Sequence, residues 1–188
     1  MKIAYLHCSI HTPGGMERVM LNKAEWLAAH GYEVLVVTTD QRGRAPFFPL
    51  PAGVRHIDLS INYTDYRELS VWQKIKGYLP KRRLHRQRLE ALLTAEHPDV
   101  VVSLYPSESS FIPSLKDGSK KVLELHQNRF FRIQYNNPGL YGAIDRLRSI
   151  QDRSIVERFD RFVVLTNEDK GLWGDLHNMV VIPNAAKM

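Results

Sequence analysis

The stretch GGMERV, residues 14–19, decides the fold of this chain because of what lies on either side of it. Residues 2–8 (KIAYLHC) have the apolar pattern of a buried strand. After the glycines, apolar residues recur at helical spacing until Gly31, and residues 33–39 (EVLVVTT) form a second apolar run. A strand, a Gly-Gly turn, a helix and a strand predict a βαβ unit. Glycine lets the backbone come close to a ligand, and the start of the helix offers unpaired N–H groups to an anion.

The rest of the chain continues this alternation. Further apolar runs predict strands at residues 54–59, 99–104, 120–126, 161–165 and 179–182. Helices are expected over 65–96, broken at Gly77 and Pro80, near 108–116, and over 140–159, where Leu140, Ile144, Leu147 and Ile150 share one stripe. Thr166, three residues before Asp169, predicts the cap of a last helix that Gly174 ends.

The strands are continuous Val, Ile and Leu runs rather than alternating ones, which is typical of strands covered on both faces. We therefore expect an α/β fold: a Rossmann-like, doubly wound, mainly parallel sheet of about seven strands with helices on both faces. The winding reverses where the first strand lies beside the fourth. Ligands of such sheets bind there, beyond the carboxyl ends of the strands.

Composition sets the class of protein. The chain has 188 residues, of which 44% are hydrophobic, so we expect one globular domain. No apolar run approaches the roughly 20 residues of a membrane span, and the N-terminus enters a strand at once without a signal-peptide pattern. The single cysteine, Cys8, fits a reducing compartment. We expect a cytoplasmic protein, peripheral on the inner face of a membrane if its net charge of +6 attracts anionic lipid.

Three alternatives for the glycine turn stay open on these residues. Gly14-Gly15 lacks the Gly-x-Gly-x-x-Gly fingerprint of a dinucleotide site, so an oxidoreductase or epimerase is weakly supported. A tight turn without a ligand, in a stand-alone binding module, is the simplest alternative. A zinc site of His7, Cys8, His11 and His126 is disfavoured, because the first and fifth strands flank the fourth and stand roughly 10 Å apart. We expect no metal.

Three segments resemble family-4 glycosyltransferases. The opening resembles the family's in GGMERV (14–19), LAAHGYEV (27–34) and the apolar run after it. VLELH (122–126) resembles the family strand that ends in a functional histidine, and VVLTNEDK (163–170) with VIPN (181–184) resembles its "Val-x-x-Ser-x-x-x-Lys … Ile-Pro-Asn-Gly" passage. Thr166 and Ala185 stand where the family has serine and glycine.

The resemblance implies the N-terminal, acceptor-side half of a retaining GT-B enzyme. Residues 1–184 would form the Rossmann-like domain, residues 185–188 would begin a linker, and the donor-binding C-terminal domain would lie outside this chain. The enzyme would need no cofactor and would use a UDP- or GDP-sugar as co-substrate. It would transfer the sugar to a glycan or lipid-linked acceptor in envelope polysaccharide synthesis. This half alone is expected to be inactive.

The resemblance also assigns candidate site residues. His126 would contact the reacting sugar as the catalytic residue, although a half-buried histidine bonding a carbonyl is the alternative. The phosphate and acceptor loop would comprise His11, Gly14, Gly15 and Glu17. Polar side chains near the expected cleft are weaker candidates for binding the acceptor: Ser107, Glu108, Asn128, Arg129 and Thr166.

A basic stretch without acidic residues runs from Leu69 to Leu89. Basic and aromatic side chains are interleaved there, which suits a helix lying on anionic lipid. A solvated helix packed on the sheet is the alternative, and no nucleic-acid partner is expected because no reading motif accompanies the patch. The predicted membrane-surface patch comprises Trp72, Lys74, Lys76, Lys81, Arg82, Arg83 and Arg86.

Overall fold

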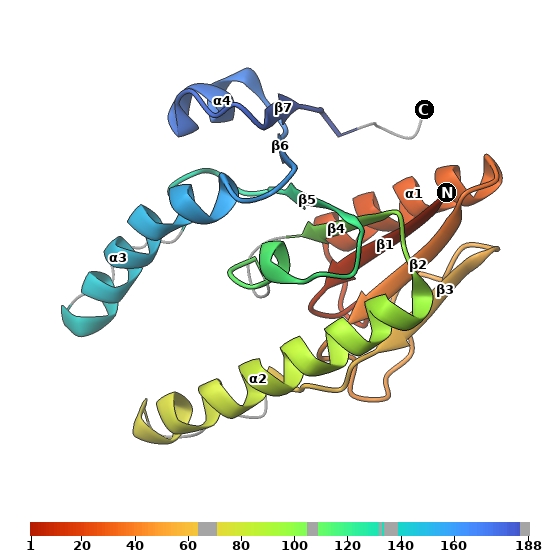
Figure 1. Cartoon of the computed structure of the whole chain (residues 1–188), viewed down its shortest axis with the longest axis horizontal. Helices are drawn as coiled ribbons and strands as arrows, with labels where there is room; N and C mark the ends of the chain where they lie inside the picture. The colour runs from red at the N-terminus through yellow and green to blue at the C-terminus, as the bar shows by residue number, and fades with distance from the viewer. Residues whose placement is uncertain (64–70, 105–108, 132, 134–138, 185–188) are drawn as a thin grey trace. The chain divides into compact units, whose positions relative to one another are not determined.

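A computed structural model describes residues 1–63, 71–104, 109–131, 133 and 139–184, with side chains for all of these except 71–76, 140 and 141. The strands form a seven-stranded parallel sheet in the order β3-β2-β1-β4-β5-β6-β7, and this confirms the Rossmann-like class (Figure 1). Residues 1–102 with 114–120 make one compact unit, and residues 103–113 with 121–186 make another.

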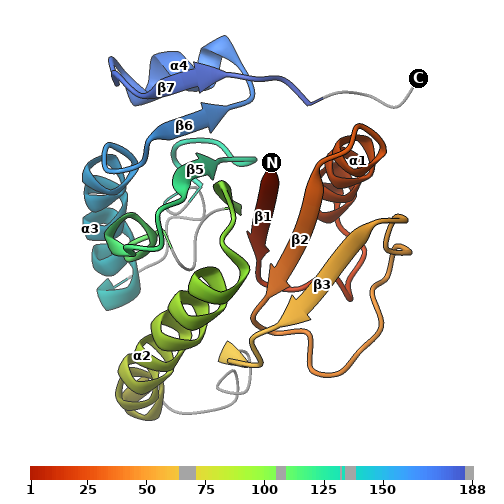
Figure 2. The same cartoon turned by 45° about the vertical axis from the view of Figure 1, so that its right-hand side comes forward.

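The first unit contains the predicted βαβ unit. It holds β1 (Lys2–His7), α1 (Gly15–Ala29), β2 (Glu33–Thr38) and β3 (Val54–Asp58). β1 pairs in parallel with β2, and β2 with β3, so the three strands run side by side (Figure 2). The central residues of β1 and β2 are buried, as continuous apolar strands require. α1 packs against β2 and β3, with Met20, Leu21 and Ala24 buried.

The helix α2 (Val71–Glu96) corrects one prediction, because it continues through Gly77 and Pro80. Proline removes one backbone hydrogen bond of a helix, but Pro80 is exposed. The helix is instead anchored by buried residues nearer its C-terminal end. Leu89 and Leu93 are fully buried. Buried His85 has its Nδ1 3.1 Å from the Tyr63 hydroxyl, and burial lowers the pKa of His85 to about 4 against a smaller opposing effect of Asp40.

Two further predictions need correction between residues 100 and 126. β4 (Val100–Leu104) agrees with its prediction, and the strand order places it next to β1. The helix expected near 108–116 is only a short 3-10 turn, Ile112–Ser114; Glu108 lies outside the described residues. β5 (Lys120–Glu124) ends two residues before His126, which therefore lies in the loop after the strand.

The second unit contains β5, α3 (Gly139–Val156), β6 (Arg161–Val164), α4 (Asn167–Trp173) and β7 (Met179–Val181). β5 pairs in parallel with β6, and β6 with β7. Thr166 caps α4 as predicted: its hydroxyl accepts a hydrogen bond from the Asp169 backbone N–H at 3.0 Å. Gly174 ends the helix with a φ of 72°. In the described part of the chain, no helix is both long and apolar enough to cross a membrane.

Candidate functional site

The glycine turn follows β1 and is held by the loops after β2. The backbone N–H of Ile10 donates to the buried Gln41 side chain at 2.9 Å, and the N–H of Phe47 donates to the Ile10 carbonyl at 2.7 Å. The backbone N–H groups of Thr39 and Asp40 both donate to the Cys8 carbonyl. The chain before the turn is therefore fixed from several sides. Gln41 was missed from the sequence, because nothing in its local pattern indicates a contact 31 residues away.

Gly14 and Gly15 differ in what surrounds them. Gly14 has extended backbone (φ −154°, ψ 151°), which any residue adopts. A Cβ on Gly14 would overlap the carboxylate of Glu17, whose side chain turns back over this glycine. A Cβ on Gly15 would meet nothing within 4 Å. Space for an approaching ligand is therefore present at Gly15, at the start of α1, where backbone N–H groups point outward.

A buried histidine supports this turn from below. His7 is the last residue of β1 and only 2% exposed. Its Nδ1 accepts a hydrogen bond from the Ser9 backbone N–H at 3.2 Å and lies 2.7 Å from the Ser9 carbonyl. Its Nε2 lies 4.0 Å from Glu17 Oε1, too far for a hydrogen bond, and has no other partner among the described residues. His7 and the Glu17 carboxylate thus lie close together without a hydrogen bond between them.

The remaining loop candidate, His11, is half-buried between β1 and the glycines. Its Nδ1 is buried and lacks a hydrogen-bond partner in the part of the chain described. Buried polar atoms without partners are uncommon in folded proteins, and a bound ligand or water is one explanation. A role for His11 in the loop stays a prediction.

A groove that the sequence did not indicate lies beside the same turn. It has a volume of about 290 Å³ and runs between α1 and the proline-rich loop at residues 48–51. Arg18, in the first turn of α1, lies with its guanidinium carbon 5.7 Å from the centre of the Phe48 ring. Asn22 and Glu25 add polar groups to the wall. The groove offers hydrogen-bonding groups and an aromatic face, the combination that sugars use.

His126 lies in the second unit with a carboxylate beside it. Its Nε2 is 3.0 Å from Oε1 of Glu124, the last residue of β5. The ion-pair distance is short, yet Nε2 has no aligned hydrogen bond within the described residues. Both side chains are buried, at 7% and 6% exposure. The pair gives the imidazole a fixed neighbour, and an imidazole nitrogen without an aligned hydrogen bond can bind a ligand, so this role for His126 stays a prediction.

The weaker acceptor candidates have local structural contacts. The Arg129 guanidinium donates to the Ser149 hydroxyl at 3.1 Å and carbonyl at 2.8 Å, and stacks 4.1 Å from the Trp173 ring centre. The Asn128 side chain accepts from the Phe130 N–H, and the Thr166 hydroxyl caps α4. Ser107 and Glu108 lie outside the described residues. Binding of an acceptor by any of these five stays a prediction.

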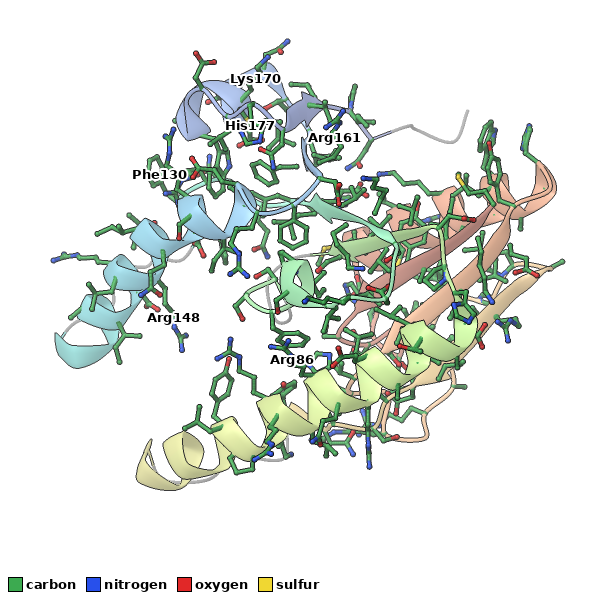
Figure 3. All side chains as sticks on the ribbon, viewed as in Figure 1. Arg86, Phe130, Arg148, Arg161, Lys170 and His177 are labelled. Carbon is green, nitrogen blue, oxygen red and sulfur yellow. The ribbon has the colours of Figure 1, made fainter. Side chains whose placement is uncertain are left out.

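The basic patch on α2 is divided between internal and outward contacts. The Lys81 ammonium donates to the Asn62 carbonyl, and Arg88 donates to the Leu59 carbonyl at 2.6 Å. Arg83 and Arg86 are exposed, next to Leu79, which is 64% exposed (Figure 3 labels Arg86). Arg82 is half-buried, and the side chains of Trp72, Lys74 and Lys76 lie outside the described residues.

The comparison with solved structures gives the same fold. Sucrose-phosphate synthase from Thermosynechococcus elongatus superposes with a TM-score of 0.71 at 15% identity, over 97% of this chain and 47% of its own. The lipopolysaccharide outer core galactosyltransferase WaaB, in its apo form, superposes with a TM-score of 0.62 at 15% identity, over 99% of this chain and 46% of its own. This chain therefore spans about half the length of either enzyme.

The sequence comparison gives the family. No curated relative matches the chain in sequence. The family model of Glycosyltransferase Family 4 matches residues 13–187. This range begins at the glycine turn and contains every strand from β2 to β7. Since that match covers nearly the whole chain without a break, this protein belongs to glycosyltransferase family 4.

Proposed function

We propose that this domain is the acceptor-side half of a retaining glycosyltransferase. It would act with a donor-binding half outside the present sequence and transfer a sugar from a UDP- or GDP-sugar to a glycan or lipid-linked acceptor. The observation that carries the proposal is the family match over residues 13–187 on a fold shared with two GT-B glycosyltransferases. WaaB is described as a lipopolysaccharide outer core galactosyltransferase, which favours an envelope glycan as acceptor.

The glycine turn has the properties needed by a phosphorylated donor or an acceptor. The open space at Gly15 lets oxygen atoms reach the first N–H groups of α1, and the helix dipole favours negative charge there. Glu17 lies over Gly14 rather than over Gly15, so its carboxylate leaves that approach open. The Nε2 of buried His7 lies 4.0 Å from this carboxylate.

His126 is proposed to hydrogen-bond the transferring sugar. In retaining transfer of this type, the departing phosphate is thought to take the acceptor proton on the same face of the sugar. The protein then contributes positioning and stabilisation of charge rather than a covalent group. An imidazole fixed by Glu124 supplies one oriented donor for this purpose. No cofactor or metal is required by this scheme.

The exposed side of α2 is proposed to lie on an anionic membrane. Arg83 and Arg86 follow the exposed Leu79 at helical spacing, and each basic residue near such a surface contributes about 1 kcal/mol. Arg83→Glu with Arg86→Glu should weaken sedimentation of the domain with phosphatidylglycerol vesicles. Unchanged sedimentation would show that this side of α2 does not bind lipid and is an ordinary solvated helix surface.

Gly15→Ala tests the proposed ligand approach. Alanine at the first position of α1 meets no atom and restricts the unfolded chain, so it should stabilise the domain by about 0.4–1 kcal/mol. In the enzyme that joins this domain to its donor-binding half, the same methyl group should reduce kcat/KM for transfer at least tenfold. A more stable but less active variant separates function from folding.

Gly171→Ala is the matched control, because Gly171 in α4 also has nothing within 4 Å of an added Cβ. It should raise stability similarly and leave transfer unchanged. Normal transfer by Gly15→Ala would show that no ligand approaches the turn at Gly15. The turn would then have only a structural role. Binding of a nicotinamide cofactor, with no transfer from any nucleotide-sugar, would favour the oxidoreductase alternative.

A further inference from the structure

The groove beside the glycine turn continues along α1, away from the place where sugar transfer is proposed. Its helical wall is formed by Arg18, Asn22 and Glu25, which share one face of α1. Since β1 and β2 are parallel, α1 begins at the carboxyl end of β1 and returns toward the amino end of β2. Each helical turn after Arg18 therefore lies further from the carboxyl ends of the strands. The groove is a separate place for a ligand.

The opposite wall of the groove is preformed. It is the loop at residues 46–51, in which φ is fixed at three prolines: Pro46, Pro49 and Pro51. Hydrogen bonds fasten both ends of this loop. The Phe47 N–H donates to the Ile10 carbonyl at 2.7 Å, and the Val54 N–H donates to the Pro51 carbonyl at 3.1 Å. Because the wall is already ordered, a ligand that enters the groove loses little affinity to the ordering of the loop.

An exposed tryptophan follows the groove along the helix. Trp26 comes one i+4 step after Asn22 on the same ridge of α1, and it is 59% exposed. The ring of His30 stacks on the Trp26 ring, with the centroids 3.9 Å apart and 22° between the planes. The Nδ1 of His30 also lies 2.7 Å from the Trp26 carbonyl. Trp26 is therefore a fixed and largely exposed aromatic surface beside the groove.

These groups match the surface of a neutral sugar ring. A pyranose has C–H groups on its faces, which pack on aromatic and proline rings, and hydroxyl groups at its edge. Arg18 only donates hydrogen bonds, a Glu25 carboxylate only accepts them and Asn22 does both, so hydroxyl groups of either orientation find a partner. The positive charge of Arg18 is balanced by Glu25, so the lining of the groove has no net charge that would attract a phosphate or a nucleic acid.

A peptide is the competing class of ligand, because aromatic-lined grooves also receive extended or proline-rich peptides. The groove has a volume of about 290 Å³, at the lower end of the roughly 300–1,000 Å³ of small-molecule pockets. Its polar groups follow one another along a single wall, which suits a ligand with hydroxyl groups along its whole edge. The acceptor proposed above is itself a glycan. These observations favour the saccharide, and the peptide becomes an outcome of the test.

We propose that the groove between α1 and the loop at residues 46–51, together with Trp26, binds a chain of neutral sugar rings. Its role rests on the proposed function, because the saccharide is taken to be part of the acceptor glycan, beyond the ring that receives the new sugar. The groove holds these further rings without touching the reacting atoms. It thereby selects long acceptors over short ones.

The test is NMR titration of the purified 188-residue chain with three neutral hexasaccharides: maltohexaose, cellohexaose and chitohexaose. At least one should bind and shift the indole N–H signal of Trp26 together with backbone amide signals of residues 18–26. If none of them binds, the proposal is overturned. Binding of decaproline instead would assign the groove to a peptide and overturn it too. Tighter, salt-dependent binding of an anionic hyaluronan hexasaccharide would overturn the neutral class.

Variants of the groove locate the binding. Trp26→Ala should weaken it about tenfold by removing the stacking surface, and Trp26→Phe should restore most of the affinity. Asn22→Ala should weaken it about fivefold through lost hydrogen bonds. Tyr78→Ala is the matched control, since Tyr78 is an exposed aromatic residue (43%) on α2, outside the groove. It should leave binding unchanged, and circular dichroism should show that each variant is folded. Unchanged affinity in both Trp26→Ala and Asn22→Ala would overturn the proposal.

Kinetics of the enzyme joined to its donor-binding half separate this inference from the proposed function. Trp26→Ala should raise KM for a long glycan acceptor at least about fivefold and leave kcat unchanged, because the contact is made equally in the ground state and the transition state. Transfer by Trp26→Ala with the wild-type KM would overturn the role of the groove and leave the proposed function standing. Saccharide binding that depends on Trp26, in an enzyme that transfers no sugar, would keep the binding site and overturn the proposed function.

Discussion

Two histidine–glutamate pairs lie near strand ends of this domain, one in each unit, and they are built differently. His7 is the last residue of β1, and its glutamate comes from the following helix at 4.0 Å. His126 lies two residues beyond β5, and its glutamate is the last residue of that same strand at 3.0 Å. The Nδ1 of His7 is bonded to the Ser9 backbone, which ties the ring to the fold. The comparison teaches that similar positions at strand ends do not imply similar roles: His7 is tied to the backbone of its own loop, whereas a ligand role for His126 stays a prediction.

His126→Gln should have the largest effect, on activity. In the enzyme joined to its donor-binding half, loss of one oriented hydrogen-bond donor should lower kcat roughly 10²–10³-fold. Glutamine is the better substitution, because alanine would leave the buried Glu124 beside a cavity and mix stability with function. Steady-state kinetics with a matched thermal melt measures both. A near-normal kcat would place His126 with His7 among the structural histidines.

His7→Ala should have the largest effect on stability. Removing a buried ring that accepts from the Ser9 N–H should lower the free energy of unfolding by about 2–4 kcal/mol. Urea denaturation of the 188-residue chain measures it. An effect below about 0.5 kcal/mol would show that His7 is not what holds the turn.

His85 sharpens the comparison, because it is a buried histidine outside both pairs. Its folded pKa of about 4 lies below its ordinary value of 6.5, so the unfolded chain binds the proton more tightly between these values. The stability from neutral His85 is complete above about pH 6.5 and decreases as the pH falls toward 4, by roughly 3 kcal/mol in all. Urea titrations at several pH values measure the slope. His85→Gln cannot titrate and should flatten it.

Glu17→Gln should have the smallest effect. It removes a negative charge from the first turn of α1, which should cost about 0.3–1 kcal/mol. Added salt should reduce the difference from wild type. A loss above about 2 kcal/mol would show that the carboxylate does more than interact electrostatically.

Local patterns predicted most of the fold, because strand and helix signals are themselves local. Every strand was expected within two residues of its observed ends, and the Thr166 cap forms as its spacing indicates. The break at Pro80 was wrong, since the burial of Leu89 and Leu93 that anchors α2 depends on tertiary packing. The outward direction of Leu147 and Ile150 was equally unreadable: a stripe shows which residues share a face but not where that face points.

The site was predicted less completely. Motifs point to Gly14, Gly15 and His126, whose roles stay predictions, but they do not indicate the support of the turn by Gln41 or its contact with the 46–48 loop. These contacts join residues more than 30 positions apart, and single-sequence patterns carry no information about such pairs. The distinction between Gly14 and Gly15 also needed coordinates, because it rests on where the Glu17 side chain lies.

The pairing of β1 with β2, and of β2 with β3, has a consequence for synthesis on the ribosome. All three strands come from residues 2–58, so these two strand pairs can form before β4, the other neighbour of β1, is translated. The pairs β5–β6 and β6–β7 likewise come from residues 120–181. Each set of strand pairs can therefore begin to form once its own segments have been synthesised, and the nascent domain can build its sheet in two successive stages.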